Sequence, residues 1–366
     1  MIGPELDIRD QFMGLRNLRK PFVAVPLGMR DATGAHIPFT ERAKKATEFL
    51  ATQIWGDTRT HATKLEAQTR PPNEQIVTKN LWMNIDKITM EELIWAIRKL
   101  KRNKAPGPDG VPVECYKDMQ EDQLQIIFDL LNKWWEGQEI ESEATRAQVI
   151  LIFKKGDKNN LANYRQISLL NTNYKLYTAI LQKKRLADVL DPYLQNTQYG
   201  FRAHRGTTNA LHYIRRIVEK GEKTETKTLL VLLDWEKAFD KVIHAKLVEA
   251  LKRMNVPSKM TNAIQELYRQ PSFRVSMENV DGEWTRQETG IRQGCPLSPY
   301  LFLIVMNCLF YDVHKNDKLD LIAHRILGTN EDEVLYADDT ICISEDEEAM
   351  NRLLGEIEKR GSSIWA

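Results

Sequence analysis

Apolar residues recur along this chain with two different spacings. A spacing of three to four residues, typical of amphipathic helices, covers residues 43–54, 89–100, 124–135, 169–190, 245–254, 298–311 and 346–360. Short apolar or alternating runs, typical of strands, cover residues 147–153, 228–233, 273–277, 283–288, 334–337 and 340–344. The order of these segments predicts an α+β fold in which helices cover one face of an antiparallel sheet.

Local signals at the ends of these segments sharpen their boundaries. Thr89 and Glu92 have the spacing of a capping box, and Ser298 followed by Pro299 is typical of a helix start. Two prolines and two glycines within residues 105–110 exclude both a helix and a central strand there. Residues 279–282 are predicted to close one hairpin, and Asp338 with Asp339 another.

Composition narrows the class of protein. The chain has 366 residues, 42% of them hydrophobic, which is ordinary for a globular protein of about two domains. Its four cysteines are far apart, which argues against a disulfide scaffold and favours a reducing, intracellular location. The apolar stretch over residues 300–311 is too short to cross a bilayer, so we expect no membrane partner.

Charge is distributed unevenly although the net charge is only +1. Residues 146–220 contain 14 lysines and arginines against four acidic residues, whereas residues 331–358 contain 11 acidic residues and one arginine. Such asymmetry is typical of a surface for a polyanion beside an acidic site, although solvated helix faces produce it as well.

Carboxylates follow two apolar strands. Asp234 ends the run 229–233, and Asp338 and Asp339 lie at the turn after 334–337. Taken alone, paired aspartates at a turn are ordinary turn residues, and Asp234 is an ordinary helix cap. If the two strands are neighbours, however, three carboxylates share one small space, and divalent cations such as Mg²⁺ or Mn²⁺ relieve their repulsion. The sequence therefore predicts an oxygen-only metal site.

Six short motifs, taken in order, resemble those of non-LTR (LINE-type) retrotransposon reverse transcriptases. Motifs A, B and C correspond to residues 234–240 (DWEKAFD), 290–299 (GIRQGCPLSP) and 336–339 (YADD). Upstream, residues 105–110 (APGPDG), 164–169 (YRQISL) and 198–202 (QYGFR) resemble elements of that family's fingers region. The resemblance covers residues 76–366 and implies a right-hand polymerase fold.

The resemblance also implies roles for nine residues. Asp234, Asp338 and Asp339 would be catalytic and would hold two Mg²⁺ ions, with Mn²⁺ as a substitute. Phe239 would be the steric gate against ribonucleotides, although a phenylalanine there also suits a helix core. The other nucleotide-binding residues implied are Lys154, Lys155, Arg165, Gln293 and Gly294. Gln166 stands where the family has proline, which leaves the backbone at Arg165 less restricted.

Domain layout and partners follow from the same resemblance. Residues 1–75 are predicted to be a partly helical connector, residues 76–225 fingers, and residues 226–366 a palm that ends at motif D, without a thumb. RNA template, DNA primer and dNTPs would be the partners, and the nucleus or a cytoplasmic ribonucleoprotein the location. One alternative is an inactive nucleic-acid-binding remnant of such an element. Another is an RNA-dependent RNA polymerase, which Phe239 and Tyr336–Ala337 disfavour.

Overall fold

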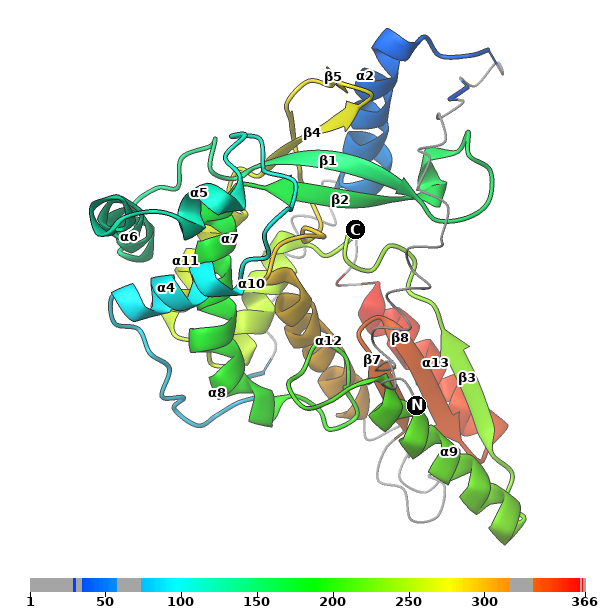
Figure 1. Ribbon diagram of the computed structural model, residues 1–366. Helices are drawn as coiled ribbons and strands as arrows, with labels where there is room; N and C mark the ends of the chain where they lie inside the picture. The colour runs from blue at the N-terminus through cyan, green and yellow to red at the C-terminus, as the bar shows by residue number, and fades with distance from the viewer. Residues whose placement is uncertain (1–28, 31–34, 58–73, 316–331, 363, 365–366) are drawn as a thin grey trace, which may run out of the picture.

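Two separate β-sheets and a set of helices make up the part of the chain that the computed structural model describes, residues 29–30, 35–57, 74–315, 332–362 and 364 (Figure 1). One sheet has five strands in the order β2-β1-β4-β5, with β6 paired to β4. The other has three strands in the order β3-β8-β7. The predicted α+β class is confirmed.

The five-stranded sheet is built around a long hairpin. Strand β1 (Arg146–Phe153) pairs antiparallel with β2 (Tyr164–Leu170) and parallel with β4 (Ser272–Met277). The short strands β5 (Val280–Asp281) and β6 (Thr285–Arg286) both pair with β4. The predicted turn over 279–282 is wrong, because Glu278 and Asn279 make a tighter turn with φ values of 52° and 67°.

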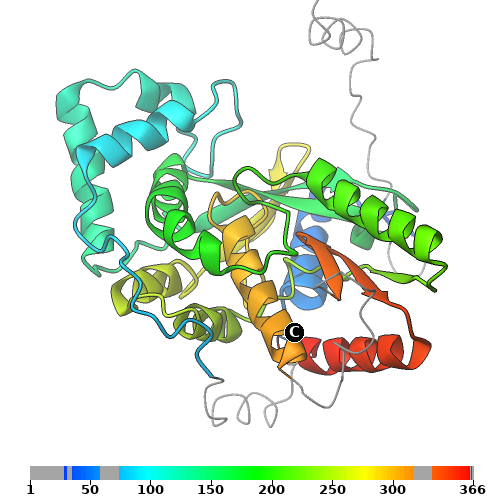
Figure 2. The ribbon, with the colours of Figure 1, turned by 90° about the horizontal axis from the view of Figure 1, so that it is seen from below.

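The three-stranded sheet has β8 (Asp339–Ser344) at its centre, paired antiparallel with both β3 (Leu229–Leu233) and β7 (Glu333–Tyr336). Side chains alternate between its faces, and both faces are apolar, so each needs a cover. Helix α9 (Thr207–Thr224) lies over one face and α13 (Glu347–Gly361) over the other (Figure 2). The expectation of a sheet covered on one face is therefore wrong.

Helix α12 (Ser298–His314) runs through the middle of the molecule between the two sheets (Figures 1 and 2). It is apolar around its whole circumference, with residues such as Phe302 and Phe310 completely buried, as expected of a central helix. Ser298 is its first helical residue, and its side chain makes no capping hydrogen bond, so the predicted cap is wrong. Helix α10 (His244–Arg253) packs beside α12.

The N-terminal helical segment, α2 (Phe39–Phe49) followed by η1 (Leu50–Ile54), packs on β4 and β5. The capping box of α4 (Met90–Lys99) is confirmed, since Thr89 and Glu92 exchange both hydrogen bonds. The helix predicted over 169–190 begins only at Thr172, because β2 continues to Leu170. The remaining elements are α5 (Val113–Lys117), α6 (Glu121–Trp135), η2 (Leu161–Asn163), α7 (Thr172–Ala179), η3 (Ile180–Ala187), α8 (Asp188–Leu190), η4 (Asp191–Tyr193) and α11 (Ser258–Leu267).

None of the described helices is both long and apolar enough to cross a membrane.

Candidate active site

Three aspartates meet at one end of the three-stranded sheet. Leu233 pairs with Thr340 and Tyr336 with Asp339, so Asp234, Asp338 and Asp339 all lie at the same end. Burial raises the pKa of Asp338, and the carboxylates of Asp339 and Asp234 raise it further. The structure thus brings Asp234 to the same place as Asp338 and Asp339, which lie more than 100 residues later in the sequence.

The turn that carries Asp338 is held by a segment from elsewhere in the chain. Ala337 has a left-handed φ of 59°, and its N–H donates to Oε1 of Gln198 at 2.9 Å. The same oxygen accepts the N–H of Gly200 at 2.8 Å. A Cβ at Gly200 would overlap the backbone of Ala337. Gln198 was not predicted as a site residue, although it begins a quoted motif, because its partner is known only from the fold.

The loop after β3 carries Phe239. Its ring stacks on Phe302 of α12, with centroids 4.5 Å apart and planes 14° from parallel. Phe201 meets it edge-on with centroids 6.2 Å apart. Phe239 packs against the core through its ring, yet as a residue it is only half-buried. Packing and contact with a ligand are therefore compatible at this position.

The loop containing Gln293 and Gly294 lies between the Phe239 loop and β2. The N–H of Ile291 donates to the carbonyl of Phe239 at 2.8 Å, and the N–H of Ser168 donates to the carbonyl of Gln293 at 2.8 Å. Gly294 has a φ of 128°, and a Cβ there would overlap the carbonyl oxygen of Ser168. Close approach to β2 is thus the reason that this position requires glycine.

Basic side chains lie at the end of the β1–β2 hairpin. Arg165 pairs with Ile152, and the N–H of Lys154 donates to Asn163 at 2.9 Å, which extends the ladder by one residue. Because strand side chains alternate, Lys154 and Arg165 lie on one face. Both are exposed, as is Lys155. Lys154 lowers the pKa of Asp338, opposing the effect of burial, so this end of the hairpin lies near the aspartates.

Gln166 does not disturb the strand that carries Arg165. Its side chain is buried, and Nε2 donates to the carbonyl of Tyr164 at 2.9 Å. Pairing with β1 imposes the extended backbone that a proline would otherwise favour.

Comparison with known proteins identifies the family. The sequence profile of the family described as reverse transcriptase (RNA-dependent DNA polymerase) matches residues 152–364. The chain belongs to this reverse transcriptase family. All nine site residues predicted from the sequence lie inside the matched region, whereas α2 and η1 lie outside it.

Several relatives are proteins of non-LTR retrotransposons. A retrovirus-related Pol polyprotein from the type-1 retrotransposable element R2 of Nasonia vitripennis is 26% identical over 76% of this chain and 26% of its own length. The transposon TX1 149 kDa protein of Xenopus laevis is 27% identical over 71% of this chain and 20% of its own length. The RNA-directed DNA polymerase from mobile element jockey of Drosophila melanogaster is 25% identical over 70% of this chain and 27% of its own length. The chain thus spans about a quarter of the length of these relatives.

A second group of potential metal ligands lies elsewhere in this reverse transcriptase chain. Among the described residues, His314, Asp332 and Glu333 are the group whose ligand atoms all lie within 4.8 Å of one another. His314 and Glu333 are joined by a hydrogen bond of 2.9 Å, and Thr197 donates to Glu333 at 3.1 Å. Glu333 begins β7, at the opposite end of that strand from Tyr336 and the aspartates. These hydrogen bonds explain the group without an ion.

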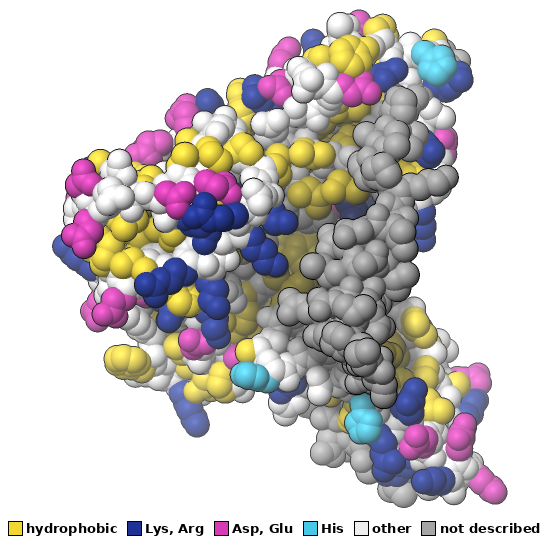
Figure 3. All heavy atoms as spheres, in the orientation of Figure 1, with side chains coloured by type: hydrophobic (Ala, Val, Ile, Leu, Met, Phe, Trp, Pro, Cys, Tyr) yellow, Lys and Arg dark blue, Asp and Glu magenta, His cyan; other side chains and the backbone are white. Residues whose placement is uncertain are grey.

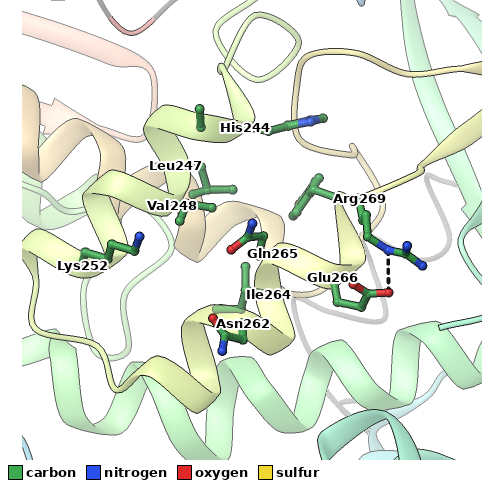
Figure 4. Close-up of a pocket in the computed structure, with 11 residues that line it drawn as sticks. His244, Leu247, Val248, Lys252, Asn262, Ile264, Gln265, Glu266 and Arg269 are labelled. Atoms are coloured by element: carbon green, nitrogen blue, oxygen red, sulfur yellow. Dashed lines mark hydrogen bonds and ion pairs between the residues drawn. The ribbon is translucent and has the colours of Figure 1, made fainter. Parts of the chain in front are cut away.

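Two hollows differ in their relation to the aspartates. A pocket of 400 Å³ between α9 and the three-stranded sheet is lined by Asp234 and Asp339 together with apolar residues such as Leu211 and Leu232. A groove of 610 Å³ between α10 and α11 is lined by residues of those helices and by Tyr268 and Arg269, which follow α11. His244 lies at one end of it (Figure 4). None of the nine predicted residues lines the groove.

Surface chemistry also differs between the parts of the molecule. Hydrophobic side chains are exposed along β1 and β2 (Figure 3), among them Ile150, Ile152 and Phe153. Lysine and arginine side chains gather over α4 and α5 (Figure 3). A run of exposed basic residues there was missed in the sequence although it is visible as a charge run: Arg98, Lys99, Lys101, Arg102 and Lys104.

Proposed function

We propose that this chain is the core of an RNA-directed DNA polymerase that adds deoxynucleotides to a primer 3′-hydroxyl on an RNA template. The observation that carries the proposal is the meeting of Asp234, Asp338 and Asp339 at one end of a sheet, with Lys154 near them. In this proposal residues 76–225 form fingers and residues 226–366 form a palm, and the three-stranded sheet is the palm sheet.

The donor set at the aspartates suits two Mg²⁺ ions. Carboxylate oxygens are the ligands that Mg²⁺ and Mn²⁺ prefer, and the raised pKa of Asp338 reflects burial and repulsion that a cation would relieve. Asp234 and Asp338 would be the main ligands, with Asp339 completing the set. Bound ions would activate the primer hydroxyl and stabilise the charge on the leaving pyrophosphate.

Residues around the aspartates would bind and orient the nucleotide. Lys154 and Arg165, on one face of the hairpin, would hold the triphosphate, the lysine as a point charge and the arginine as a bidentate fork. Lys155 would add charge beside them. Phe239 would exclude a 2′-hydroxyl by contact, and Gln293 with Gly294 would line the site for the base.

Template and primer are polyanions, so their binding would depend on lysines and arginines and weaken with salt. The basic run at the end of α4 and the exposed basic residues of β2 and α9 supply such charges. Membrane contact has no part in the proposal.

The test is primer extension by the purified chain on an RNA template with Mg²⁺ or Mn²⁺. Asp338→Asn should abolish extension, a loss of about 1000-fold or more because charge stabilisation worth several kcal/mol disappears. The control is Asp122→Asn, which changes an exposed aspartate on α6 away from the aspartates. Primer–template binding should stay nearly unchanged in both variants.

Three results would refute the proposal. Equal extension by the wild-type and Asp338→Asn proteins would show that Asp338 is not needed for catalysis. Binding of nucleic acid without any extension in either metal would favour the inactive remnant, the alternative left open by the sequence. A preference for ribonucleotides would indicate an RNA polymerase.

A further inference from the structure

Trp55 links the N-terminal helical segment to the loop that carries Phe239. It follows η1, lies outside the region matched by the family profile, and is almost completely buried. Its indole Nε1–H donates to Oδ1 of Asp240 at 3.0 Å, across 185 residues of sequence. Asp240 is itself buried and directly follows Phe239.

The backbone of Trp55 makes a second connection at the same place. Its carbonyl oxygen accepts the N–H of Glu288 at 3.1 Å and that of Thr289 at 3.0 Å. The Thr289 hydroxyl in turn donates to the carbonyl of Asp240 at 3.3 Å. The indole also packs edge-on against Phe273 of β4, with centroids 4.5 Å apart. Trp55 is therefore held by contacts on several sides, and its indole N–H offers the Asp240 carboxylate a donor in a fixed position.

The backbone of the loop around Asp240 is tightly constrained. Lys237 has a left-handed φ of 54°, and its carbonyl accepts the N–H of Asp240 at 2.9 Å. At Gly290, a Cβ would overlap the carbonyl of Asp240. A change in the position of Asp240 would therefore move Phe239, which is its direct neighbour in the chain and stacks on Phe302.

We infer that Trp55 is a positioning residue for nucleotide selection, because its hydrogen bond to Asp240 fixes the loop that carries Phe239. The inference rests on the proposed function for its effect on sugar choice. Asp240 is not a metal ligand in this scheme, since its side chain is buried and one oxygen accepts the indole N–H. An acceptor is needed at position 240, and a charge is not.

The test uses two measurements on the same set of variants. Hydrogen–deuterium exchange of residues 235–242 reports the loop directly and needs no activity. Competition between dNTPs and rNTPs in primer extension reports sugar selection. Trp55→Phe, which removes the N–H but keeps an aromatic ring, should speed exchange in this segment and lower the dNTP preference about threefold or more.

Asp240 provides the matched variants. Asp240→Ala should reproduce the effects of Trp55→Phe, and the double variant should be no worse than Asp240→Ala alone. Asp240→Asn keeps an acceptor oxygen for the indole and should retain the dNTP preference. The control is Trp82→Phe, because Trp82 is 89% exposed.

The outcomes separate this inference from the proposed function. No extension by the wild-type chain would refute the proposed function, and exchange in residues 235–242 would then decide whether Trp55 holds the loop. Unchanged exchange in Trp55→Phe and Asp240→Ala would overturn the inference. So would an unchanged dNTP preference in those variants when the wild-type chain extends primers, or an effect of Asp240→Asn as large as that of Asp240→Ala.

Discussion

At the residue scale, Phe239 is held by its neighbours although the residue is only half-buried. Phe302 lies parallel to it at 4.5 Å, and the Phe239 carbonyl accepts the N–H of Ile291. Phe302 belongs to a buried helix and is itself completely buried, so packing restricts the position of its ring. The position of the Phe239 ring is therefore set by its contacts with Phe302 and Phe201.

Shortening Phe239 should weaken discrimination between sugars. In Phe239→Ala the bulk that excludes a 2′-hydroxyl is lost, and we expect ribonucleotide incorporation to rise about tenfold or more relative to deoxynucleotides, equal to about 1.4 kcal/mol. Competition assays with a matched dNTP and rNTP measure the ratio. Phe153→Ala is the control, since it removes a partly exposed phenylalanine at the end of β1. An unchanged ratio would leave Phe239 with a packing role alone.

Two residues near this loop, the buried Asp240 and the half-buried His244, have pKa values that are shifted in opposite directions. Burial lowers the pKa of His244 from 6.5 to about 4, so the unfolded chain binds its proton more tightly and stability rises with pH between these values. Burial raises the pKa of Asp240 from 3.8 to about 6, so the folded chain binds its proton more tightly and stability falls as pH rises through that window. The two effects partly cancel between pH 4 and pH 6.5.

Removing either titratable group should reveal the pH dependence of stability that the other group causes. On going from pH 7 to pH 5, His244→Gln should lose less stability than wild type, and Asp240→Asn should lose more, each by about 1–2 kcal/mol. Both substitutions keep a hydrogen-bonding group of similar size. Urea unfolding at the two pH values measures the differences. The same change in unfolding free energy with pH in all three proteins would contradict the shifted pKa values of His244 and Asp240.

At the scale of elements, a short segment from before α9 completes the three-stranded sheet. Residues 197–200 pair with β7 through a parallel bridge between Gln198 and Leu335. The N–H of Leu335 donates to Thr197, and the N–H of Tyr199 donates to Leu335. The turn carrying Asp338 is thus supported from the side opposite β8, which compensates for the left-handed backbone at Ala337.

Gln198→Ala should reveal this support. The change leaves two backbone N–H groups without their acceptor, those of Gly200 and Ala337. We expect a loss of about 1–3 kcal/mol in unfolding free energy and a lower kcat, with little change in the KM for primer–template. Asn196→Ala, at an exposed position two residues earlier, is the control. Equal kcat values for the two variants would show that the turn keeps its shape without Gln198.

At the scale of the whole molecule, the two sheets bring opposite charges together. Lys154 belongs to the end of the five-stranded sheet, and Asp338 belongs to the three-stranded sheet, yet Lys154 influences the pKa of Asp338. Helix α12 lies between the sheets and packs in the core that both share. The arrangement leaves a basic edge near an acidic edge, which suits a nucleotide that carries both a triphosphate and bound metal ions.

Lys154→Ala should therefore act on the nucleotide rather than on the nucleic acid. Loss of one charge-assisted contact to the triphosphate should raise the KM for dNTP about tenfold or more. The affinity for primer–template should change little. Steady-state extension at varied dNTP concentration and a filter-binding assay measure the two quantities. Lys158→Ala, an exposed lysine farther along the same loop, is the control. A lower affinity for primer–template with an unchanged KM for dNTP would indicate that Lys154 contacts the nucleic acid instead.

Sequence by itself predicted most of the helices and strands and the family of this protein, because periodicity, capping signals and short motifs are local properties. The apolar run 229–233, the capping box at Thr89 and the alternation in 147–153 all produced the expected strands and helix, since periodicity and capping act within a few residues. Ordered motifs were also enough to indicate the reverse transcriptase family, which the family profile confirmed.

Only the tertiary structure decided which distant groups meet. Gln198 reaches Ala337 across 139 residues, and Trp55 reaches Asp240 across 185, and nothing in the local sequence around either residue specifies its partner. Likewise, the cover on both faces of the three-stranded sheet follows from the packing of α9 and α13. The start of the helix at Thr172 follows from the pairing of β2 with β1, which continues to Leu170. Hydrogen bonds and packing between segments far apart in the chain depend on the path of the whole backbone, so they become visible only in the fold.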